Sequence, residues 1–334
     1  MKRLSPFMIG FLVVAAIAVV VLGMRVESAI LIALFFSTLR QTTPLLLTAL
    51  GGMFSERSGV VNIALEGMIL FGAAAAAISV ERLEAPMLAA DPLARSAWIP
   101  WVGVLVGMLM GGLVATVYAI AVIRYRAEQI VTGTAINLLA AGAPPVLMQA
   151  LYNTTTNSKE VENRLINIPI AGESISPLVF LAFLLVPLCW WVMFKTPWGL
   201  RLRAVGEQPE AADTMGINVY RMRYTAVILS GLLAGLAGAY LSVGFLNQFV
   251  KNMSAGQGFI ALAALIFGKW HPLGVLGATL LFGFFRALAI QLQGGEVMPS
   301  VVVEAIPYVL TILVLAGFIG RSRPPAAVGK PYEK

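Results

Sequence analysis

Few residues in this chain have side chains that could do covalent chemistry, and they do not occur in sets. The 334 residues include a single histidine, His271, and a single cysteine, Cys189. Metal clusters of histidine and cysteine, and Ser-His-Asp or Cys-His arrangements built around a second histidine, are therefore excluded. Cys189 lies inside an apolar run and has no second cysteine for an intramolecular disulfide. The sequence predicts no catalytic residue and no metal site.

Hydrolysis of ATP by this chain is excluded by its motifs. A phosphate-binding loop of the form G-x-x-x-x-G-K-[ST] does not occur, because the Gly-Lys pairs at 268–269 and 329–330 are followed by Trp270 and Pro331. The chain is therefore expected to hold no cofactor of its own. If it moves a solute uphill, the energy must come from an ion gradient or from a partner.

Three ionisable residues lie inside long apolar runs, namely Glu66, Arg286 and Glu304. Ion-coupled carriers usually place several such groups at mid-membrane, because coupling needs titratable or coordinating side chains there. Arg286 and Glu304 lie toward one side, within reach of the external surface, and receive no assigned role. Glu66 lies about one turn inside its run. A functional role and a structural one, pairing with Arg57 or capping a broken helix, are both open for it.

A polar turn precedes Glu66 in the segment GGMFSERSGVVNIALEGM, residues 51–68. The turn occupies 55–59, and Asn62 and Glu66 follow it about one helical turn apart, which places them on one face of a helix. Such a face can line a water-filled path without exposing polar groups to lipid. We expect a cytoplasmic turn here, between an interrupted span and the next one.

The elements that must position these residues are transmembrane helices. Hydrophobic residues make up 59% of the chain and charged residues 12%, about half the usual share in soluble domains. Mean hydropathy is +0.87, and the apolar runs are continuous, which favours helices over a barrel. We predict an all-α polytopic membrane protein with about ten transmembrane helices. The expected spans are 7–23, 29–53 (interrupted near 40–44), 62–80, 98–122, 129–150, 177–194, 224–244, 256–268, 273–291 and 300–319.

Lysine and arginine in the short loops predict the orientation. Basic residues gather at 124–126, within 195–224 and after 320, so these segments are expected in the cytoplasm. Loops 81–97 and 151–176 have no basic excess and are expected outside. Ten crossings with both termini in the cytoplasm place every loop on the side that its basic residues predict. The net charge of +7 follows from this pattern and does not indicate binding of nucleic acid.

Two runs allow a second interpretation. The run 7–23 follows two basic residues, as a secretory signal would, but it is long and no small-residue cleavage site stands out. We therefore predict a first transmembrane helix there. The run 256–268 is short and flanked by glycine, so a re-entrant hairpin stays open beside a full crossing.

Two further patterns concern packing and repetition. Small residues recur at four-residue spacing in Gly107/Gly111 and Gly231/Gly235, which predicts close helix packing and not a site. The segment FGKWHPLGVLGATLLFG, residues 267–283, loosely repeats the order of 51–68, with an apolar run, a polar turn and a glycine-rich helix. It is a candidate counterpart in a second structural half.

The long basic loop KTPWGLRLRAVGEQPEAADTMGINVYRMRY, residues 195–224, contains a short predicted helix. Pro209 suits the first helical position, Glu210 complements the N-terminal dipole, and Gly216 suits the position just past the end. The helix therefore covers 209–215. A short capped helix at the membrane surface has no need of lipid, and it is typical of a docking site for a cytoplasmic protein.

These residues carry a family resemblance. LRAVGEQPEAADTMGINVYRMRY is similar to the ATPase-docking loop of permease subunits in bacterial ABC importers, in the group that includes branched-chain amino acid and simple-sugar permeases. LGGMFSERSGVVNIALEGMILFGAAAA resembles the subset for nucleosides and simple sugars, whose substrate-binding lipoproteins are of the basic membrane protein type. AGQGFIALAALIFGKWHPLGVLGATLLFGFFRAL and the tail PAAVGKPYEK fit the same subset.

The resemblance implies roles for particular residues. The core of the coupling helix would be formed by Gly206, Glu207, Pro209, Ala212 and Gly216. The side chain of Ala212 is expected to face the ATPase. The residues expected to face the translocation pathway are Asn62, Glu66 and, on a neighbouring span, Asn137.

The resemblance also implies a fold and a set of partners. Residues 1–334 would form a single permease domain in the bacterial inner membrane, with 195–224 as its cytoplasmic coupling loop. The partners would be an ATPase subunit that hydrolyses ATP, a second permease subunit that is commonly a different chain, and an external substrate-binding lipoprotein. An ion-coupled secondary transporter and a non-transporting scaffold or receptor are the alternatives, and neither explains the docking loop.

Overall fold

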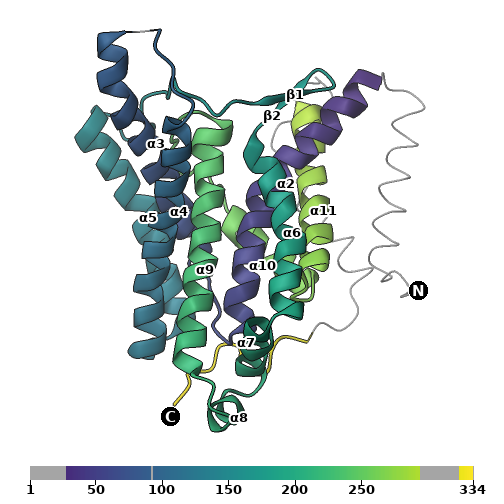
Figure 1. Cartoon of the computed structure of the whole chain (residues 1–334). Coiled ribbons are helices and arrows are strands. Elements are labelled where there is room, and N and C mark those ends of the chain that lie inside the picture. The colour runs from purple at the N-terminus through teal and green to yellow at the C-terminus, as the bar shows by residue number, and fades with distance from the viewer. Residues whose placement is uncertain (1–27, 92, 294–322, 334) are drawn as a thin grey trace.

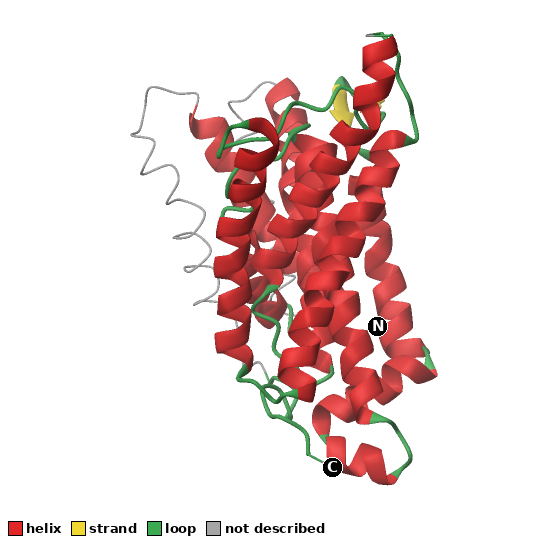
Figure 2. Ribbon diagram, turned by 90° about the vertical axis from the view of Figure 1, so that its left-hand side faces the viewer, coloured by secondary structure: helices red, strands yellow, loops and turns green. Residues whose placement is uncertain are grey.

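The computed structural model describes residues 28–91, 93–293 and 323–333. Within them the chain is mostly helical, as predicted, with long helices side by side and one small hairpin at an end of the bundle (Figure 1 and Figure 2). The long helices are α2 (Ser28–Arg57), α3 (Leu65–Ala90), α4 (Ile99–Ala119), α5 (Gln129–Tyr152), α6 (Pro177–Lys195), α9 (Val219–Ala239) and α11 (Pro272–Gln293).

Shorter elements complete the described chain. Helices α7 (Pro197–Glu207) and α8 (Pro209–Thr214) lie between α6 and α9, and α10 (Gln257–Phe267) precedes α11. Helices α4 and α9 each continue into a π-helical turn, η1 (Ile120–Arg124) and η2 (Tyr240–Phe245). Strands β1 (Ile168–Ile170) and β2 (Glu173–Ile175) form the antiparallel hairpin, with Pro169 opposite Ser174.

Six of the described helical segments are long and apolar enough to cross a membrane. They are α2, α4 with η1, α5, α6, α9 with η2, and α11. Helix α3 has 26 residues but carries charged residues near both ends, and α10 has only 11 residues. The runs 7–23 and 300–319 lie outside the described residues. The chain is thus a multi-pass helical membrane protein, while the count of about ten spans stays a prediction.

The predicted interruption near 40–44 is wrong, because α2 is one continuous helix with Pro44 inside it. Proline has no N–H, so the carbonyl of Arg40, one turn earlier, lacks its usual helical partner. The hydroxyl of Tyr240 donates to that carbonyl at 3.1 Å. A neighbouring helix therefore supplies the missing hydrogen bond, which is how proline is tolerated in membrane helices.

Helix α9 forms the centre of the bundle. It packs on α4, α3 and α2, and 83% of its most apolar stretch is buried. A Cβ atom added at Gly111 of α4 would lie 2.6 Å from Cα of Gly235 on α9, so only glycine allows this approach. The predicted close packing of the small-residue helices is confirmed.

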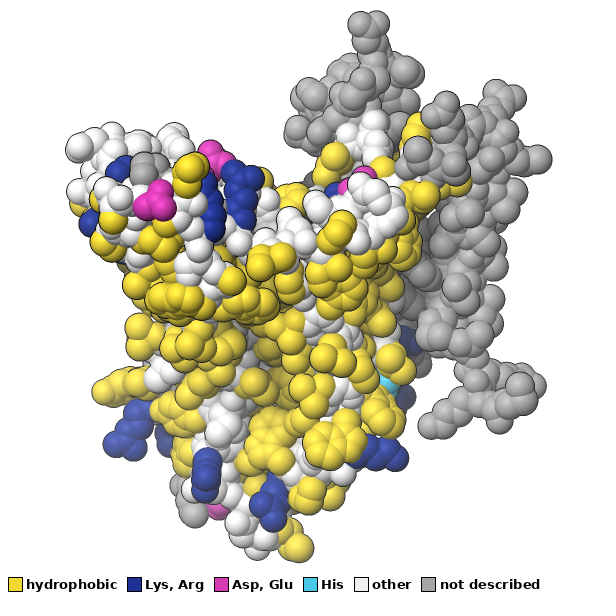
Figure 3. All heavy atoms as spheres, turned by 45° about the horizontal axis from the view of Figure 1, so that its top comes forward, with side chains coloured by type: hydrophobic (Ala, Val, Ile, Leu, Met, Phe, Trp, Pro, Cys, Tyr) yellow, Lys and Arg dark blue, Asp and Glu magenta, His cyan; other side chains and the backbone are white. Residues whose placement is uncertain are grey.

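The two ends of the bundle carry different structures. Figure 1 shows α7 and α8 at one end and the β1–β2 hairpin at the other, so loops 195–224 and 151–176 lie at opposite ends, as predicted. Residues 81–90, expected in a loop, instead continue α3. On the face seen in Figure 3, apolar side chains predominate between the two ends. The placement of the α8 end in the cytoplasm stays a prediction.

Candidate docking and translocation sites

The foot of the bundle is built by two consecutive short helices. The hydroxyl of Thr196 accepts a hydrogen bond from Gly199 N at 3.1 Å and so caps α7. Helix α8 covers Pro209–Thr214, one residue shorter than predicted. Gly216 has φ of +81°, and Ile217 N donates to Ala212 O at 3.0 Å. The predicted end of the helix at a left-handed glycine is therefore confirmed.

Gly206 holds this foot against the end of α2. A Cβ atom at Gly206 would overlap the carbonyl oxygen of Arg57, so the last turn of α7 contacts the backbone of α2 directly. The next residue, Glu207, is exposed, and its carboxylate accepts a hydrogen bond from Ala326 N at 3.3 Å. These two predicted coupling residues thus connect the foot to α2 and to the C-terminal segment.

The orientation predicted for Ala212 is wrong. Its side chain is only 4% exposed and belongs to the main hydrophobic core of this chain, so it cannot face a partner. A helix of six residues needs an apolar contact to stay on the bundle, and the face that holds Pro209 and Ala212 supplies it. The residues that α8 turns outward are Glu210, Ala211 and Thr214, followed by Met215, which is 82% exposed.

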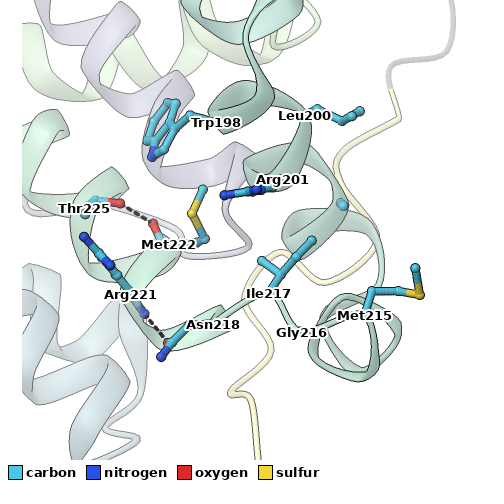
Figure 4. Close-up of a pocket in the computed structure, with 11 residues that line it drawn as sticks. Trp198, Leu200, Arg201, Met215, Gly216, Ile217, Asn218, Arg221, Met222 and Thr225 are labelled. Atoms are coloured by element: carbon cyan, nitrogen blue, oxygen red, sulfur yellow. Dashed lines mark hydrogen bonds between the residues drawn. The ribbon is translucent and has the colours of Figure 1, made fainter.

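A groove of about 810 Å³ lies beside α8, between α7 and the first turns of α9. Trp198 and Met222 contribute to its walls, and the exposed residues Arg201 and Arg221 line it as well. Figure 4 shows Arg201 extending from α7 toward α9, and Met215 lines the groove at its α8 side. The α8 end therefore offers an apolar groove bordered by positive charge, next to a protruding helix.

Glu66 lies in the first turn of α3 and is 6% exposed. One carboxylate oxygen, Oε1, accepts hydrogen bonds from Ser254 Oγ at 2.5 Å and from Gly256 N at 2.8 Å. The other, Oε2, accepts from Gly258 N at 2.6 Å. A carboxylate at this position complements the positive N-terminal end of α10. The capping role left open by the sequence is therefore present, applied to a short helix.

The alternative that Glu66 pairs with Arg57 is wrong within the described residues. Arg57 donates through Nε and Nη2 to the carbonyl of Trp270, at 3.1 and 2.9 Å. Glu66 and Arg57 lie on different sides of the turn, since α2 ends at Arg57 and α3 begins only at Leu65. Glu66 instead binds the residues at the start of α10, and Arg57 binds Trp270 just after its end.

Asn62 does not share a helical face with Glu66, because it lies in the non-helical stretch before α3. Gly59, with φ of +93°, turns the chain there and delays the start of the helix. The Nδ2 atom of buried Asn62 donates to Ser230 Oγ on α9 at 3.0 Å, while its Oδ1 has no partner among the described residues. Asn62 therefore connects the turn to the central helix.

Asn137 on α5 contacts the same stretch of chain. Its Oδ1 accepts from Gly67 N at 2.8 Å, and its Nδ2 donates to Ile63 O at 2.9 Å. The structure thus brings all three predicted pathway residues to the start of α3, where each holds backbone or side chain of a neighbouring helix. Their role in the translocation pathway stays a prediction.

Comparison with known proteins decides the family. Residues 34–315 match the family described as "Branched-chain amino acid transport system / permease component". The chain belongs to this family. It is a permease component and not an enzyme, and within the described residues the predicted docking loop and the α3 start lie in the matched region. No solved structure matches it.

The permease is similar to named transport proteins over most of its length. It is 45% identical over 312 residues to the guanosine ABC transporter permease protein NupQ of Bacillus subtilis, covering 89% of this chain and 95% of the relative. The nucleoside ABC transporter permease protein NupC of Lactococcus lactis is 42% identical, with 88% and 94% covered. A second B. subtilis guanosine permease protein, NupP, is 26% identical over 288 residues, with 79% and 74% covered.

Sequence reasoning missed the contacts between the two similar segments of the permease. Trp270 donates through Nε1 to Glu56 Oε2 at 2.5 Å, and its carbonyl receives the two bonds from Arg57. Trp270 itself has φ of +50°, so the backbone after α10 is sharply turned. The sequence held one signal for these contacts, the loose similarity between 51–68 and 267–283. The turns of these two segments are the ones that contact each other.

Sequence reasoning also missed a cavity of about 560 Å³ between α2, α10, α11 and η2. Its polar lining is Gln41, Gln257 and Arg286, and the rest is largely apolar, with Phe245 and Phe282 among it. With its amide oriented to satisfy both groups, Gln257 accepts from Arg286 Nη1 at 2.9 Å. The three polar residues could not be grouped from the sequence, because they lie far apart in the chain on three different helices.

Proposed function

We propose that this permease is a subunit of an ATP-binding-cassette importer that brings nucleosides, or related simple sugars, into a bacterial cell. The observation that carries the proposal is its 45% identity, over 89% of the chain, to a guanosine ABC transporter permease protein. The chain does no covalent chemistry. A separate ATPase subunit hydrolyses ATP, and an external substrate-binding lipoprotein delivers the solute to the inner membrane.

The ATPase docks, in this proposal, on α8 and the adjacent groove. The outward face of α8 presents Glu210, Ala211 and Met215, and the groove beside it has an apolar wall and two exposed arginines. Protein interfaces combine an apolar centre with a polar rim, which is the arrangement here. Buried Ala212 and close-packed Gly206 hold the helix on the bundle, so a push on α8 moves the foot as a unit.

The second permease subunit packs, in this proposal, on α5. Only 17% of the most apolar stretch of α5 is buried, the least among the six long apolar segments described. Leu138, Leu139 and Val146 are exposed beside Gly142, whose missing side chain leaves an open notch. Two different B. subtilis chains bear the name guanosine permease protein, and this supports a pair of unlike subunits.

The solute passes, in this proposal, along the cavity that Gln41, Gln257 and Arg286 line. A mainly apolar cavity with a few fixed polar groups suits a nucleoside, which combines a flat base with ribose hydroxyls. Ser254, Gly256 and Gly258 bind Glu66, and residues 255 and 257 of the same stretch line the cavity. Glu66, Asn62 and Asn137 then belong to the pathway as residues that hold its wall.

Uptake by the purified complex tests the proposal against an ion-coupled transporter. The permease, its second permease subunit and the ATPase are reconstituted in vesicles, and entry of radiolabelled guanosine is measured with the binding lipoprotein outside. Uptake is expected to require ATP and to continue when proton and sodium gradients are collapsed. Uptake by this chain alone, abolished by collapse of a gradient, would overturn the assignment.

A further inference from the structure

The segment 325–332, within the last described residues 323–333, lies across the end of the bundle that carries α8 (Figure 1). We call it the C-terminal strap. It contains little regular structure, yet Ala327 and Tyr332 are both buried. Chain ends are usually poorly ordered unless something ties them down. The contacts that bury this one identify what it is tied to.

The first half of the strap is bound to the turn after α2 and to the end of α7. Ala327 N donates to Gly206 O at 2.9 Å, and Gly329 N donates to Gly59 O at 3.1 Å. A Cβ atom at Gly59 would lie 3.2 Å from Ala327 O, so the strap and the turn are in close contact. The strap therefore joins the predicted coupling residue Gly206 to the turn that begins the α3 segment.

The second half of the strap is bound to α8 and α9 through Tyr332. Its ring packs edge-on against Tyr220, with the ring centroids 5.4 Å apart. Its hydroxyl hydrogen-bonds the carboxylate of Asp213 on α8. Burial, and next this bond, raise the pKa of the Tyr332 hydroxyl, and the protonated hydroxyl is the donor to Asp213.

A buried arginine joins the two halves. Arg223 on α9 is 3% exposed, and its Nη1 donates to Lys330 O of the strap at 3.1 Å. Its guanidinium also lies 6.0 Å from the Tyr332 ring centroid. A Cβ atom at Gly59 would lie 2.9 Å from Nη2, so this cation sits between strap and turn. Burying a cation is costly unless it is held, and the strap supplies much of what holds it.

We propose that the C-terminal strap couples the docking helix to the translocation core, with Tyr332 and Arg223 as its positioning residues. Through Tyr332 it is bound to α8, and through Ala327 and Gly329 it is bound to the turn whose continuation carries Asn62 and Glu66. A six-residue helix has little attachment of its own, so the strap adds a second connection between α8 and that turn. The inference rests on the proposed docking of an ATPase at α8.

The test separates coupling from stability by measuring solute molecules imported per ATP hydrolysed in the purified complex. Tyr332→Phe removes only the hydroxyl and keeps the packed ring, and Asp213→Asn removes the charge of its partner. Each is expected to lower this ratio by roughly threefold to tenfold, the range for loss of a typical intramolecular hydrogen bond. The double variant should be no worse than Tyr332→Phe alone, because without the hydroxyl no bond is left for Asp213→Asn to weaken.

Glu333→Gln is the matched control. Glu333 forms an exposed ion pair with Arg126 at 2.6 Å, next to Tyr332 but beyond the strap. Exposed pairs contribute little, so this variant should keep the wild-type ratio. An unchanged ratio in Tyr332→Phe and in Asp213→Asn would overturn the proposal. If the wild-type complex shows no ATP-dependent uptake at all, the proposed function fails first, which distinguishes the two failures.

Discussion

The two polar segments that stand out in the sequence, 58–66 and 209–216, are built in opposite ways. Around Glu66 every carboxylate oxygen is bound by donors from the start of α10, and the segment is buried between helices. On α8 only Ala212 is buried, while Glu210, Ala211 and Thr214 are exposed and Asp213 is bonded to Tyr332 of the strap. The polar residues of the interior thus hold neighbouring helices together, whereas most of those on α8 lie on an exposed surface.

This contrast predicts where a substitution will damage the fold and where it will damage assembly. In the interior, removal of one group leaves several buried donors without an acceptor. At the foot, a substitution changes a surface that water can cover in the free subunit. The free energy of unfolding and the recovery of partner subunits should therefore respond to different positions.

Glu66→Ala should have the largest effect. It leaves Ser254 Oγ, Gly256 N and Gly258 N unsatisfied in a buried place, which should cost about 3 to 5 kcal/mol. We expect a large fall in the melting temperature of the detergent-solubilised permease and in its yield. Glu66→Gln keeps one acceptor oxygen and should lose less.

Thermal unfolding of the three proteins, monitored by intrinsic fluorescence, checks this order. Transport in the Gln variant then addresses the pathway role directly. A Glu66→Ala protein as stable as wild type would mean that these hydrogen bonds do not hold α10, and the distinction between the two segments would collapse.

Ala212→Trp should have the next largest effect on stability. The cause is disturbed packing inside the chain and not a clash with a partner. Because Ala212 is buried in the chain's own core, a tryptophan must displace α8 or its neighbours, at about 1 to 3 kcal/mol. Ala211→Trp is the matched variant on the exposed side of the same helix. It should leave the melting temperature unchanged and block co-purification of the ATPase.

The pair is informative because both variants add the same side chain at adjacent positions. Equal melting temperatures for Ala212→Trp and wild type would contradict the observed orientation of α8. Normal ATPase recovery with Ala211→Trp would remove the exposed face of α8 from the docking surface.

Asn137→Ala should have an intermediate effect. It deletes two hydrogen bonds that join α5 to Ile63 and Gly67, for a loss of about 1 to 2 kcal/mol. Asn137→Asp keeps the acceptor for Gly67 N but loses the donor to Ile63 O. Its melting temperature should therefore be lowered more at neutral pH than at pH 4, where the carboxyl can be protonated and donate again. The reverse order would argue against these two bonds.

Local sequence rules predicted the foot of the bundle well, because capping residues act over a few positions. Pro209 and Gly216 gave the two ends of α8 to within a residue. These capping residues could not predict which face of α8 is buried. That depends on which face finds apolar contacts on α7 and α9, and Ala212 is as acceptable in a partner's groove as in a core.

In the interior, the sequence indicated which polar residues matter but not which residues they bind. An intramembrane carboxylate must be satisfied, so Glu66 could be recognised as important from the sequence alone. Its donors come from residues 254–258, more than half the chain length away, and no periodicity connects them. The helical face shared by Asn62 and Glu66 failed because one left-handed glycine, Gly59, delayed the start of α3.

Gly216→Val should have the smallest effect on stability and still reduce function. At φ of +81° a β-branched residue is strained by on the order of 1 to 2 kcal/mol, although nothing lies near enough to clash with it. The strain acts on α8 alone, which can fray without unfolding the bundle. The melting temperature should therefore stay near wild type, while ATPase recovery and guanosine uptake fall.

Gly172→Val is its matched control, since Gly172 has φ of +86°, also lies in open space, and sits between β1 and β2 at the other end of the bundle. It imposes the same backbone strain far from α8, so ATPase recovery should be normal. Equal loss of ATPase in both variants would show that any local strain disturbs assembly. Loss of ATPase recovery with Gly216→Val alone would show that binding of the ATPase depends on the conformation of α8, because the fold would be intact in both variants.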